Sequence, residues 1–212
     1  MQTRLLLVSH APTAAQRSGR FAGADEGLDA RGHAAAAAYA RQADLARGNS
    51  AALTSPAACA RETAAALGLA ATVCDALAET DYGSWRGRRL TELAAEASQA
   101  LEAWLRDPAA APPGGESFEA VLARVGAWLD GYAVHDDAAD RSSDRTVIAI
   151  THAAVMRAAI VHTLQATSAA FAHIEIAPLT VVELRRSTRG WAWWPAQQIA
   201  PGTAREIAPG DQ

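Results

Sequence analysis

The sequence predicts an α/β fold: a three-layer sandwich whose mostly parallel central sheet has helices on both faces. Two apolar runs, residues 4–8 and 146–151, lack the alternation of a half-exposed strand and end at polar residues, which is typical of strands buried on both faces. Alanine-rich segments of helical length separate the strand candidates, and strands that alternate with helices favour a parallel sheet. A chain of 212 residues is long enough to bury one such core.

The first third of the chain contains three strand candidates and two helix candidates. These are the strands 4–8, 51–54 and 71–74 and the helices 29–47 and 56–67. Asp29 is a suitable N-cap for the first helix, and Gly48 and Asn49 supply its end. In the second helix, Ser55 is the expected cap and Pro56 the first helical residue.

The segment 75–145 has a different composition and is interpreted as a helical insertion over one end of the sheet. Its predicted parts are a Gly- and Arg-rich loop at 81–89, helices at 91–106 and 117–132, a Pro/Gly turn at 108–115 and a polar loop at 134–145. The remaining expected elements are a helix at 153–164 and strands at 146–151, 172–176, 180–185 and 190–199. We therefore expect one domain over residues 1–199 and a flexible C-terminal tail at 200–212.

Charge and residue usage exclude several classes of function. The formal net charge is −4, which is the wrong sign for nucleic acid or an anionic membrane as partner. All 19 basic residues are arginine, so no lysine is present for Schiff-base chemistry or a P-loop. Cys59 and Cys74 form no disulfide framework, and no apolar stretch has the length of a signal peptide or a membrane span. We expect a cytoplasmic protein.

Two histidines directly follow the two buried-strand candidates. His10 comes after the strand 4–8, and His152 comes after the strand 146–151. Ligands of open α/β sheets bind beyond the carboxyl ends of the strands, so neighbouring strands would direct both imidazoles into one crevice. Imidazole titrates near neutrality and serves as nucleophile or acid–base group. Glu79, which opens the Gly-rich loop, is the leading candidate for an accompanying carboxylate.

Several segments together resemble, in order and spacing, the motifs of one family. They are residues 5–13 (LLLVSHAPT), 20–23 (RFAG), 28–32 (LDARG), 55–64 (SPAACARETA), 77–87 (LAETDYGSWRG), 115–124 (GESFEAVLAR) and 147–157 (VIAITHAAVMR). This set resembles the histidine phosphatase superfamily, the relatives of cofactor-dependent phosphoglycerate mutase. The resemblance covers roughly residues 3–190, and it implies the phosphoglycerate mutase-like fold.

The resemblance implies a two-step hydrolysis of a small phosphorylated metabolite, with no metal or other cofactor. His10 would attack phosphorus and form a phosphohistidine, Glu79 would protonate the leaving oxygen, and His152 would stabilise the equatorial oxygens. The substrate-binding positions implied by the motifs are Ser9, Thr13, Gln16, Arg20, Gly23, Cys59 and Ala153. The resemblance implies a sugar phosphate, a nucleotide or the nucleotide-loop precursor of cobalamin as the substrate, and the sequence favours none of the three.

The pocket motifs depart from the family pattern at both arginine positions. Ser9 stands where the family has the arginine before the first histidine, and Cys59 stands where it has the second arginine. Arg61 lies two residues further along the helix and is expected to point elsewhere. Alanines replace the two glycines that follow the histidines, Ala11 and Ala153. We expect nearby arginines on loops to compensate, the candidates being Arg20, Arg88 and Arg89.

Two alternative functions follow from these departures. One is a catalytically weak phosphatase relative that binds a phosphorylated or other small ligand. The other is a metal-binding pocket, because Cys59 brings a thiol toward His10, His152 and Glu79, and these are ligand types that zinc accepts. The cluster of Trp191, Trp193 and Trp194 has two interpretations as well, a homodimer surface or packing of a terminal strand.

Overall fold

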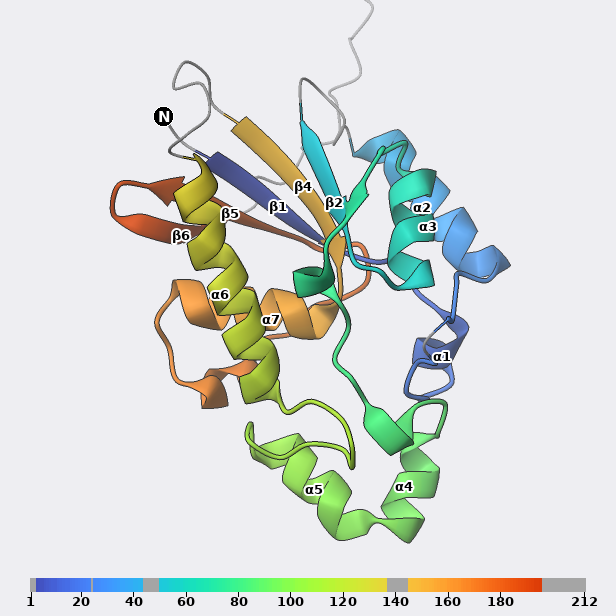
Figure 1. The fold of residues 1–212 in the computed structure, drawn as a ribbon. Helices are drawn as coiled ribbons and strands as arrows, with labels where there is room; N and C mark the ends of the chain where they lie inside the picture. The colour runs from blue at the N-terminus through green and yellow to red at the C-terminus, as the bar shows by residue number, and fades with distance from the viewer. Residues whose placement is uncertain (1–2, 24, 44–49, 137–144, 196–212) are drawn as a thin grey trace, which may run out of the picture.

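The computed structural model describes residues 3–23, 25–43, 50–136 and 145–195 (Figure 1). Its six strands are β1 Thr3–Ser9, β2 Ala51–Thr54, β3 Thr72–Val73, β4 Arg145–Thr151, β5 Val181–Ser187 and β6 Gly190–Trp194. Its α-helices are α1 Ala14–Arg17, α2 Ala30–Gln42, α3 Ala58–Ala66, α4 Leu90–Glu96, α5 Ser98–Arg106, α6 Phe118–Asp136 and α7 Ala153–Thr163. Three 3-10 turns complete the described elements: η1 Asp75–Leu77, η2 Gly83–Trp85 and η3 Ser168–His173.

The strands form one six-stranded sheet in the order β3-β2-β4-β1-β5-β6. The pairs β2–β3, β2–β4 and β1–β4 are parallel, and β5 and β6 add an antiparallel edge. The chain leaves β1 toward β2 on one side and leaves β4 toward β5 on the other, so the order reverses at the β1–β4 pair. A crevice at such a reversal is the usual ligand site of an open α/β sheet.

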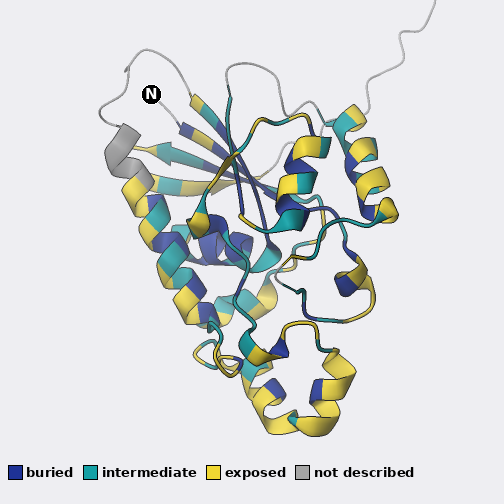
Figure 2. Cartoon of the chain, turned by 45° about the vertical axis from the view of Figure 1, so that its right-hand side comes forward, coloured by how far each residue is buried: buried dark blue, intermediate teal, exposed yellow. Residues whose placement is uncertain are grey.

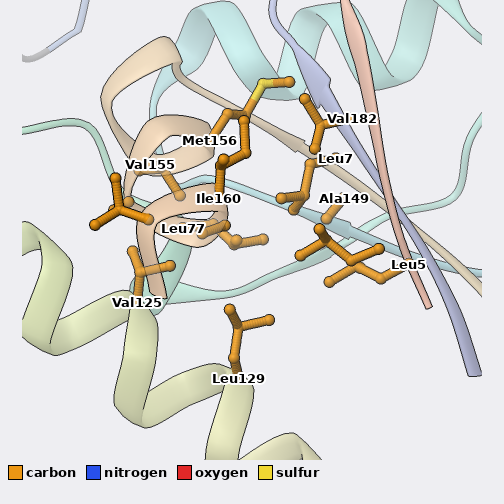
Figure 3. Packing of buried hydrophobic residues seen from close by; sticks show 14 of the residues in the cluster. Leu5, Leu7, Leu77, Val125, Leu129, Ala149, Val155, Met156, Ile160 and Val182 are labelled. Carbon is orange, nitrogen blue, oxygen red and sulfur yellow. The ribbon is translucent and has the colours of Figure 1, made fainter. Parts of the chain in front are cut away.

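The apolar runs form central strands because each of their faces has a helical layer to pack against. In β1, Leu5 and Leu7 pack in the core on the α6–α7 face, whereas Leu6 and Val8 pack in the core that faces α3. β4 alternates in the same way. Figure 3 shows the first of these cores, with Val125, Leu129 and Met156 facing the strand residues, and Figure 2 shows the buried sheet beneath the exposed outer sides of the helices. The predicted three-layer α/β class is confirmed.

The predicted insertion has two parts that pack differently. Helices α4 and α5 lie beyond one end of the sheet, around an apolar cluster that includes Phe21, Trp85 and Leu93. Helix α6 instead packs along α7, and its Val121, Val125 and Leu129 join the main core. These three residues recur every fourth position, which gives α6 an apolar stripe on one face. The helix therefore belongs to a layer of the sandwich and not to its end.

Several predicted elements differ from the structure. The helix 91–106 is two helices, because the backbone of Ala97 leaves helical geometry (φ −141°) and lets Leu93 and Leu101 reach one cluster. The segment 172–176 is not a strand: its first two residues belong to η3, and it pairs with no strand among the described residues. Helix α3 begins with Ala57 as its N-cap, two residues after the predicted cap. The Ser55 hydroxyl accepts from the Ala57 N–H and also contacts His152. The short helix α1 was not predicted.

Some predicted features lie outside the described residues. These are the end of the helix 29–47 with its stop at 48–49, most of the loop 134–145, the end of the strand 190–199 and the tail 200–212. Within the described part, Asp29 caps α2 as predicted, accepting a hydrogen bond from the Gly32 N–H at 2.9 Å. None of the described helices is long and apolar enough to cross a bilayer.

The three clustered tryptophans have different environments. Trp191 is half-buried and donates its indole N–H to the carbonyl of Leu129 at 3.0 Å, so it packs strand β6 against α6. Trp193 and Trp194 are 49% and 42% exposed. The guanidinium of Arg185 lies 4.1 Å from the Trp194 ring centre. Strand packing therefore accounts for Trp191, and the homodimer stays a prediction.

In the loop that follows Glu79, the backbone at Gly83 lies close to the backbone of the 113–115 turn. Gly83 has a φ of +51°, and a Cβ there would lie 2.3 Å from the carbonyl oxygen of Pro113. Gly87 has a similar backbone, with a φ of +76°, but a Cβ there would meet nothing within 4 Å. Substitutions at the two glycines can therefore be compared to separate the cost of a left-handed backbone from the cost of the clash with Pro113.

We predict that Gly83→Ala lowers the free energy of unfolding by about 1–3 kcal/mol more than Gly87→Ala does. Both variants carry the backbone penalty, and only the first must also displace the 113–115 turn. Urea unfolding of the wild type and the two variants measures the difference. Equal losses of unfolding free energy in the two variants would contradict the prediction, because they would show that the 113–115 turn moves without loss of stability.

Candidate functional site

The pairing of β1 with β4 brings the two histidines together. Ser9 is the register partner of Thr151, and each is the last residue of its strand. His10 and His152 are the next residues, and the backbone N–H of His10 donates to the Thr151 carbonyl at 2.9 Å. Their ring centres are 5.0 Å apart, with the planes at 61°. The side chains are only 4% and 1% exposed, so both imidazoles lie at the floor of the crevice.

A backbone carbonyl fixes the tautomer of His10. Its Nδ1 lies 2.8 Å from the carbonyl oxygen of Ala11. A carbonyl only accepts, so Nδ1 carries the proton and the lone pair is on Nε2. The Ala11 N–H in turn donates to the Thr63 hydroxyl oxygen at 3.0 Å, and that hydroxyl donates to the Cys59 carbonyl at 2.7 Å. These bonds hold α3, and with it Cys59, beside His10.

His152 contacts a hydroxyl on one side and a carboxylate on the other. Its Nε2 lies 2.8 Å from Ser55 Oγ, and its Nδ1 lies 3.0 Å from Oε2 of Glu79. The Nδ1–carboxylate contact is close enough for an ion pair, but its direction is not that of a hydrogen bond, so this buried nitrogen has no hydrogen-bond partner. Ser55 comes from the neighbouring strand end, after β2, which explains its place at the site.

Glu79 is placed by bonds from two layers of the fold. It follows η1, and the hydroxyl of Thr151 donates to the Leu77 carbonyl at 2.8 Å. From α6, Nη1 of Arg124 donates to the carbonyl oxygens on either side of Leu77, at 2.8 and 3.2 Å. The Glu79 side chain is 25% exposed and faces the crevice. Glu79 therefore lies beside both histidines because the sheet edge and α6 hold its loop.

The crevice is a cavity of about 730 Å³. The three predicted catalytic residues, His10, Glu79 and His152, all line it. Six of the seven predicted substrate-binding residues line it too: Thr13, Gln16, Arg20, Gly23, Cys59 and Ala153. Ser9 does not: it is the buried last residue of β1, and its backbone bonds to the 179–180 turn. Thr13 and Gln16 already bond to each other in the capping box of α1.

Of the three arginines expected to compensate, only Arg20 lines the cavity. Arg20 lines it as predicted, 3.1 Å from the carboxylate of Glu26. Arg88 and Arg89 do not line it, because Arg88 pairs with Glu96 and Arg89 caps α4. The lining arginines outside the prediction are Arg86, Arg124 and Arg157. Arg61 lies away from the cavity, as expected.

Arg157 differs from the other lining arginines in its partners. It lies one helical turn after Ala153 on α7, so both face the cavity. Its Nε is buried without a hydrogen-bond partner, and among the described residues it forms a loose ion pair, 3.6 Å from the exposed Glu175. Arg86 and Arg124, in contrast, pair with Asp81 and Glu116 at 2.7 and 3.0 Å. Arg157 is thus the guanidinium best placed to receive an anion.

The chain matches the family model for the histidine phosphatase superfamily (branch 1) over residues 5–194. It belongs to the histidine phosphatase superfamily. A bifunctional protein of Mycobacterium tuberculosis is 33% identical over 188 residues, a match that covers 85% of this chain and 50% of that protein. The chain thus spans about half the length of the curated relatives it matches.

Solved structures of phosphatases are similar over almost the whole chain. A mycobacterial glucosyl-3-phosphoglycerate phosphatase, in complex with VO3, is 26% identical with a TM-score of 0.77, covering 90% of this chain and 96% of that one. A putative alpha-ribazole-5'-P phosphatase from Escherichia coli is 21% identical with a TM-score of 0.79, covering 91% and 94%. The second likeness is one of fold. The phosphoglycerate mutase-like architecture is therefore confirmed.

The protonation of this histidine phosphatase site follows from burial and mutual charge. Burial lowers the pKa of His10, the charge of His152 lowers it further, and Glu79 opposes both. Burial alone would raise the pKa of Glu79, but the charge of His152, and then of His10, brings it below its ordinary value. Burial and the charge of Glu79 raise the pKa of the Cys59 thiol to about 12. At neutral pH the site thus holds a neutral His10, an ionised Glu79 and a protonated thiol.

The lowered pKa of His10 predicts a loss of stability in mild acid. Between its folded-state pKa and the ordinary value of 6.5, the unfolded chain binds a proton that the folded chain does not. The free energy of unfolding therefore falls as the pH drops through that window. Glu79, whose pKa is also lowered, adds a further loss as the pH falls through its own folded-state value.

We predict that His10→Gln loses less stability than the wild type between about pH 7 and pH 5, because glutamine does not titrate. Urea unfolding midpoints at a series of pH values measure this slope. His173→Gln is the matched control, since His173 is exposed and outside the cavity, and it should keep the wild-type slope. A His10→Gln slope equal to that of the wild type would contradict the assignment.

Proposed function

We propose that the protein is a phosphomonoester hydrolase that acts on a small phosphorylated metabolite through a phosphohistidine at His10. The observation that carries the proposal is the arrangement at the cavity floor: a histidine with its Nε2 lone pair free, a second buried histidine at 5.0 Å and a carboxylate beside it. Nucleophile, charge stabiliser and proton donor are what a two-step phosphoryl transfer requires.

In the first step, Nε2 of His10 attacks phosphorus in line with the ester bond. The N–P bond forms, the P–O bond to the leaving alcohol breaks, and the alcohol oxygen takes a proton from Glu79. The resting carboxylate is ionised, so the proton comes with the substrate: a phosphate monoester has a second pKa of about 6 and enters in part as the monoanion. The negative phosphoryl group next to Glu79 also favours the protonated carboxyl.

In the second step, a water molecule takes the place of the alcohol. Glu79, now ionised, accepts a proton from this water as it attacks phosphorus, the N–P bond breaks, and inorganic phosphate and neutral His10 are released. The hydrogen bond from Nδ1 to the Ala11 carbonyl supports the imidazole while charge passes through it. His152, 5.0 Å away and buried, is the group that faces the equatorial phosphoryl oxygens.

Arg157 supplies the positive charge that the two substituted arginine positions lack. Its Nε is already desolvated and unpaired, so an arriving phosphate oxygen gains a charge-assisted hydrogen bond without breaking another. Arg20, in comparison, must share its charge with Glu26. This difference in partners supports an anion-binding role for Arg157 rather than for Arg20.

We predict that His10→Gln lowers kcat for an aryl phosphate by about a thousandfold or more, because no other side chain replaces the nucleophile. Steady-state release of inorganic phosphate measures it. His173→Gln again serves as the control and should retain full turnover. Activity of His10→Gln within tenfold of the wild type would remove His10 from the mechanism.

We predict that Glu79→Gln slows hydrolysis of an alkyl phosphate far more than that of nitrophenyl phosphate. An alkoxide needs a proton to leave, whereas nitrophenolate leaves readily without one. The ratio of the two kcat/KM values, in the variant and the wild type, measures the effect and cancels any general loss of folding. Equal losses on both substrates would give Glu79 a structural role in place of the acid.

For Arg157→Met we predict a loss of about 10–100-fold in kcat/KM for phosphomonoesters, the size of one charge-assisted hydrogen bond. Methionine keeps much of the apolar stem, so packing along α7 changes little. Arg61→Met removes an arginine that does not line the cavity and should leave kcat/KM unchanged. An equal effect of the two substitutions would mean that Arg157 does not contact the substrate.

A further inference from the structure

The floor of the cavity also holds a set of metal-ligand types. One ligand atom each from His10, Cys59 and His152 lies within 4.8 Å of the other two, and all three residues are buried. Zinc favours imidazole and thiolate ligands, whereas calcium and magnesium favour oxygen ligands. We propose that this cluster binds one Zn²⁺ ion, and that the bound ion blocks the phosphoryl-transfer site.

The hydrogen bonds around the two histidines orient them as metal ligands. A ligating histidine commonly donates its other ring N–H to a carbonyl or hydroxyl, which fixes the lone pair toward the metal. Nδ1 of His10 donates to the Ala11 carbonyl, which leaves the Nε2 lone pair free. Nε2 of His152 contacts the Ser55 hydroxyl, and the buried Nδ1 on its other side has no hydrogen-bond partner. His10 thus presents a free Nε2, and Nδ1 of His152 lies 3.0 Å from Oε2 of Glu79, so a metal bound there would lie beside this carboxylate.

The spacing fits a tetrahedral ion after a small contraction. Zinc–nitrogen and zinc–sulfur bonds place ligand atoms about 3.3–3.8 Å apart, so the most distant pair must close by about 1 Å. Glu79 is not one of the three clustered ligands and contacts only His152 among them, with Oε2 at 3.0 Å from Nδ1, so a water would fill the fourth position. The Cys59 thiol gives up its proton to solvent as the sulfur–zinc bond forms. Neither redox change nor any other co-reactant is involved.

The charge of the cavity favours a cation. Six carboxylates line it against four guanidinium groups: Glu26, Asp75, Glu79, Asp81, Asp107 and Glu116 against Arg20, Arg86, Arg124 and Arg157. Three of these arginines are paired within 3.1 Å of a carboxylate, which leaves the acidic excess uncompensated. The thiol of Cys59 therefore stands in a pocket that attracts a divalent ion.

Zinc and the proposed reaction compete for the same lone pair. Nε2 of His10 either bonds to zinc or attacks phosphorus, and it cannot do both. Zinc bound here therefore acts as an inhibitor that substrate or inorganic phosphate displaces. The inhibition rests on the proposed function, whereas the binding of zinc does not.

Binding is tested on the metal-free chain with Zn²⁺ and with Co²⁺ as a spectroscopic substitute. We expect one equivalent of either ion per chain and a thiolate-to-cobalt charge-transfer band. Cys59→Ser should abolish the band and weaken Zn²⁺ binding at least about tenfold. Cys74→Ser is the matched control, because Cys74 is the other cysteine and does not line the cavity. It should keep both properties.

The wild-type titration decides the site even if a variant fails to fold. No stoichiometric zinc binding by the wild type, or a cobalt spectrum without a thiolate band, would overturn the site.

The inhibition is tested by phosphatase assays with a chelator and with one equivalent of Zn²⁺, and by whether inorganic phosphate weakens Zn²⁺ binding. Full activity of the zinc-loaded protein would overturn the inhibition. A protein inactive in chelator that still binds zinc through Cys59 would overturn the proposed phosphatase function and support the zinc site.

Discussion

The parallel pairing of β1 with β4 is the constraint on which the site depends. Its register places Ser9 opposite Thr151, so the next residue of each strand is a histidine at the carboxyl edge of the sheet. A shift of one residue would turn every side chain of β1 to the opposite face, and Leu5 and Leu7 would leave the core they share with α6 and α7. The register that buries the two apolar faces is therefore also the register that brings the imidazoles to 5.0 Å.

Neighbouring elements hold the other residues of the site at this edge of the sheet. Ser55, at the end of the neighbouring strand, contacts His152, and α6 holds the Glu79 loop through Arg124. Burial then determines the protonation states, because it lowers the pKa of His10 and raises the pKa of Cys59, which stays a thiol. An unprotonated nucleophile beside an ionised carboxylate is poised for a substrate that brings its own proton. The same ionised carboxylate and free lone pair also suit a divalent cation, so the proposed zinc ion and the proposed phosphate ester would compete for the cavity floor.

The sequence predicted what depends on local pattern. Unbroken apolar runs identified β1 and β4, and a histidine directly after each run placed both at the ends of buried strands. That these two strands are neighbours is known from the structure. Glu79 was the leading carboxylate candidate because it opens the Gly-rich loop, but its role as proton donor came only from the family resemblance. The roles of Ser55 and Arg157 arise only in three dimensions: Ser55 has the pattern of a helix cap, and the unpaired Nε of Arg157 depends on what surrounds α7. Arg88 and Arg89 were misplaced because α4 determines where they lie: the Arg88 guanidinium pairs with Glu96, and the Arg89 backbone N–H donates to Glu92. No periodicity in the sequence fixes the direction of that helix.

The most direct test of the account is whether phosphorus becomes bonded to His10 during turnover. Metal-free protein is mixed with a labelled phosphomonoester, quenched in base within the first turnover, and digested for mass analysis. The account predicts an acid-labile, base-stable phosphoryl group on the peptide that contains His10, formed no later than the alcohol product. Turnover without any phosphoprotein, or a phosphoryl group on another residue, would contradict it.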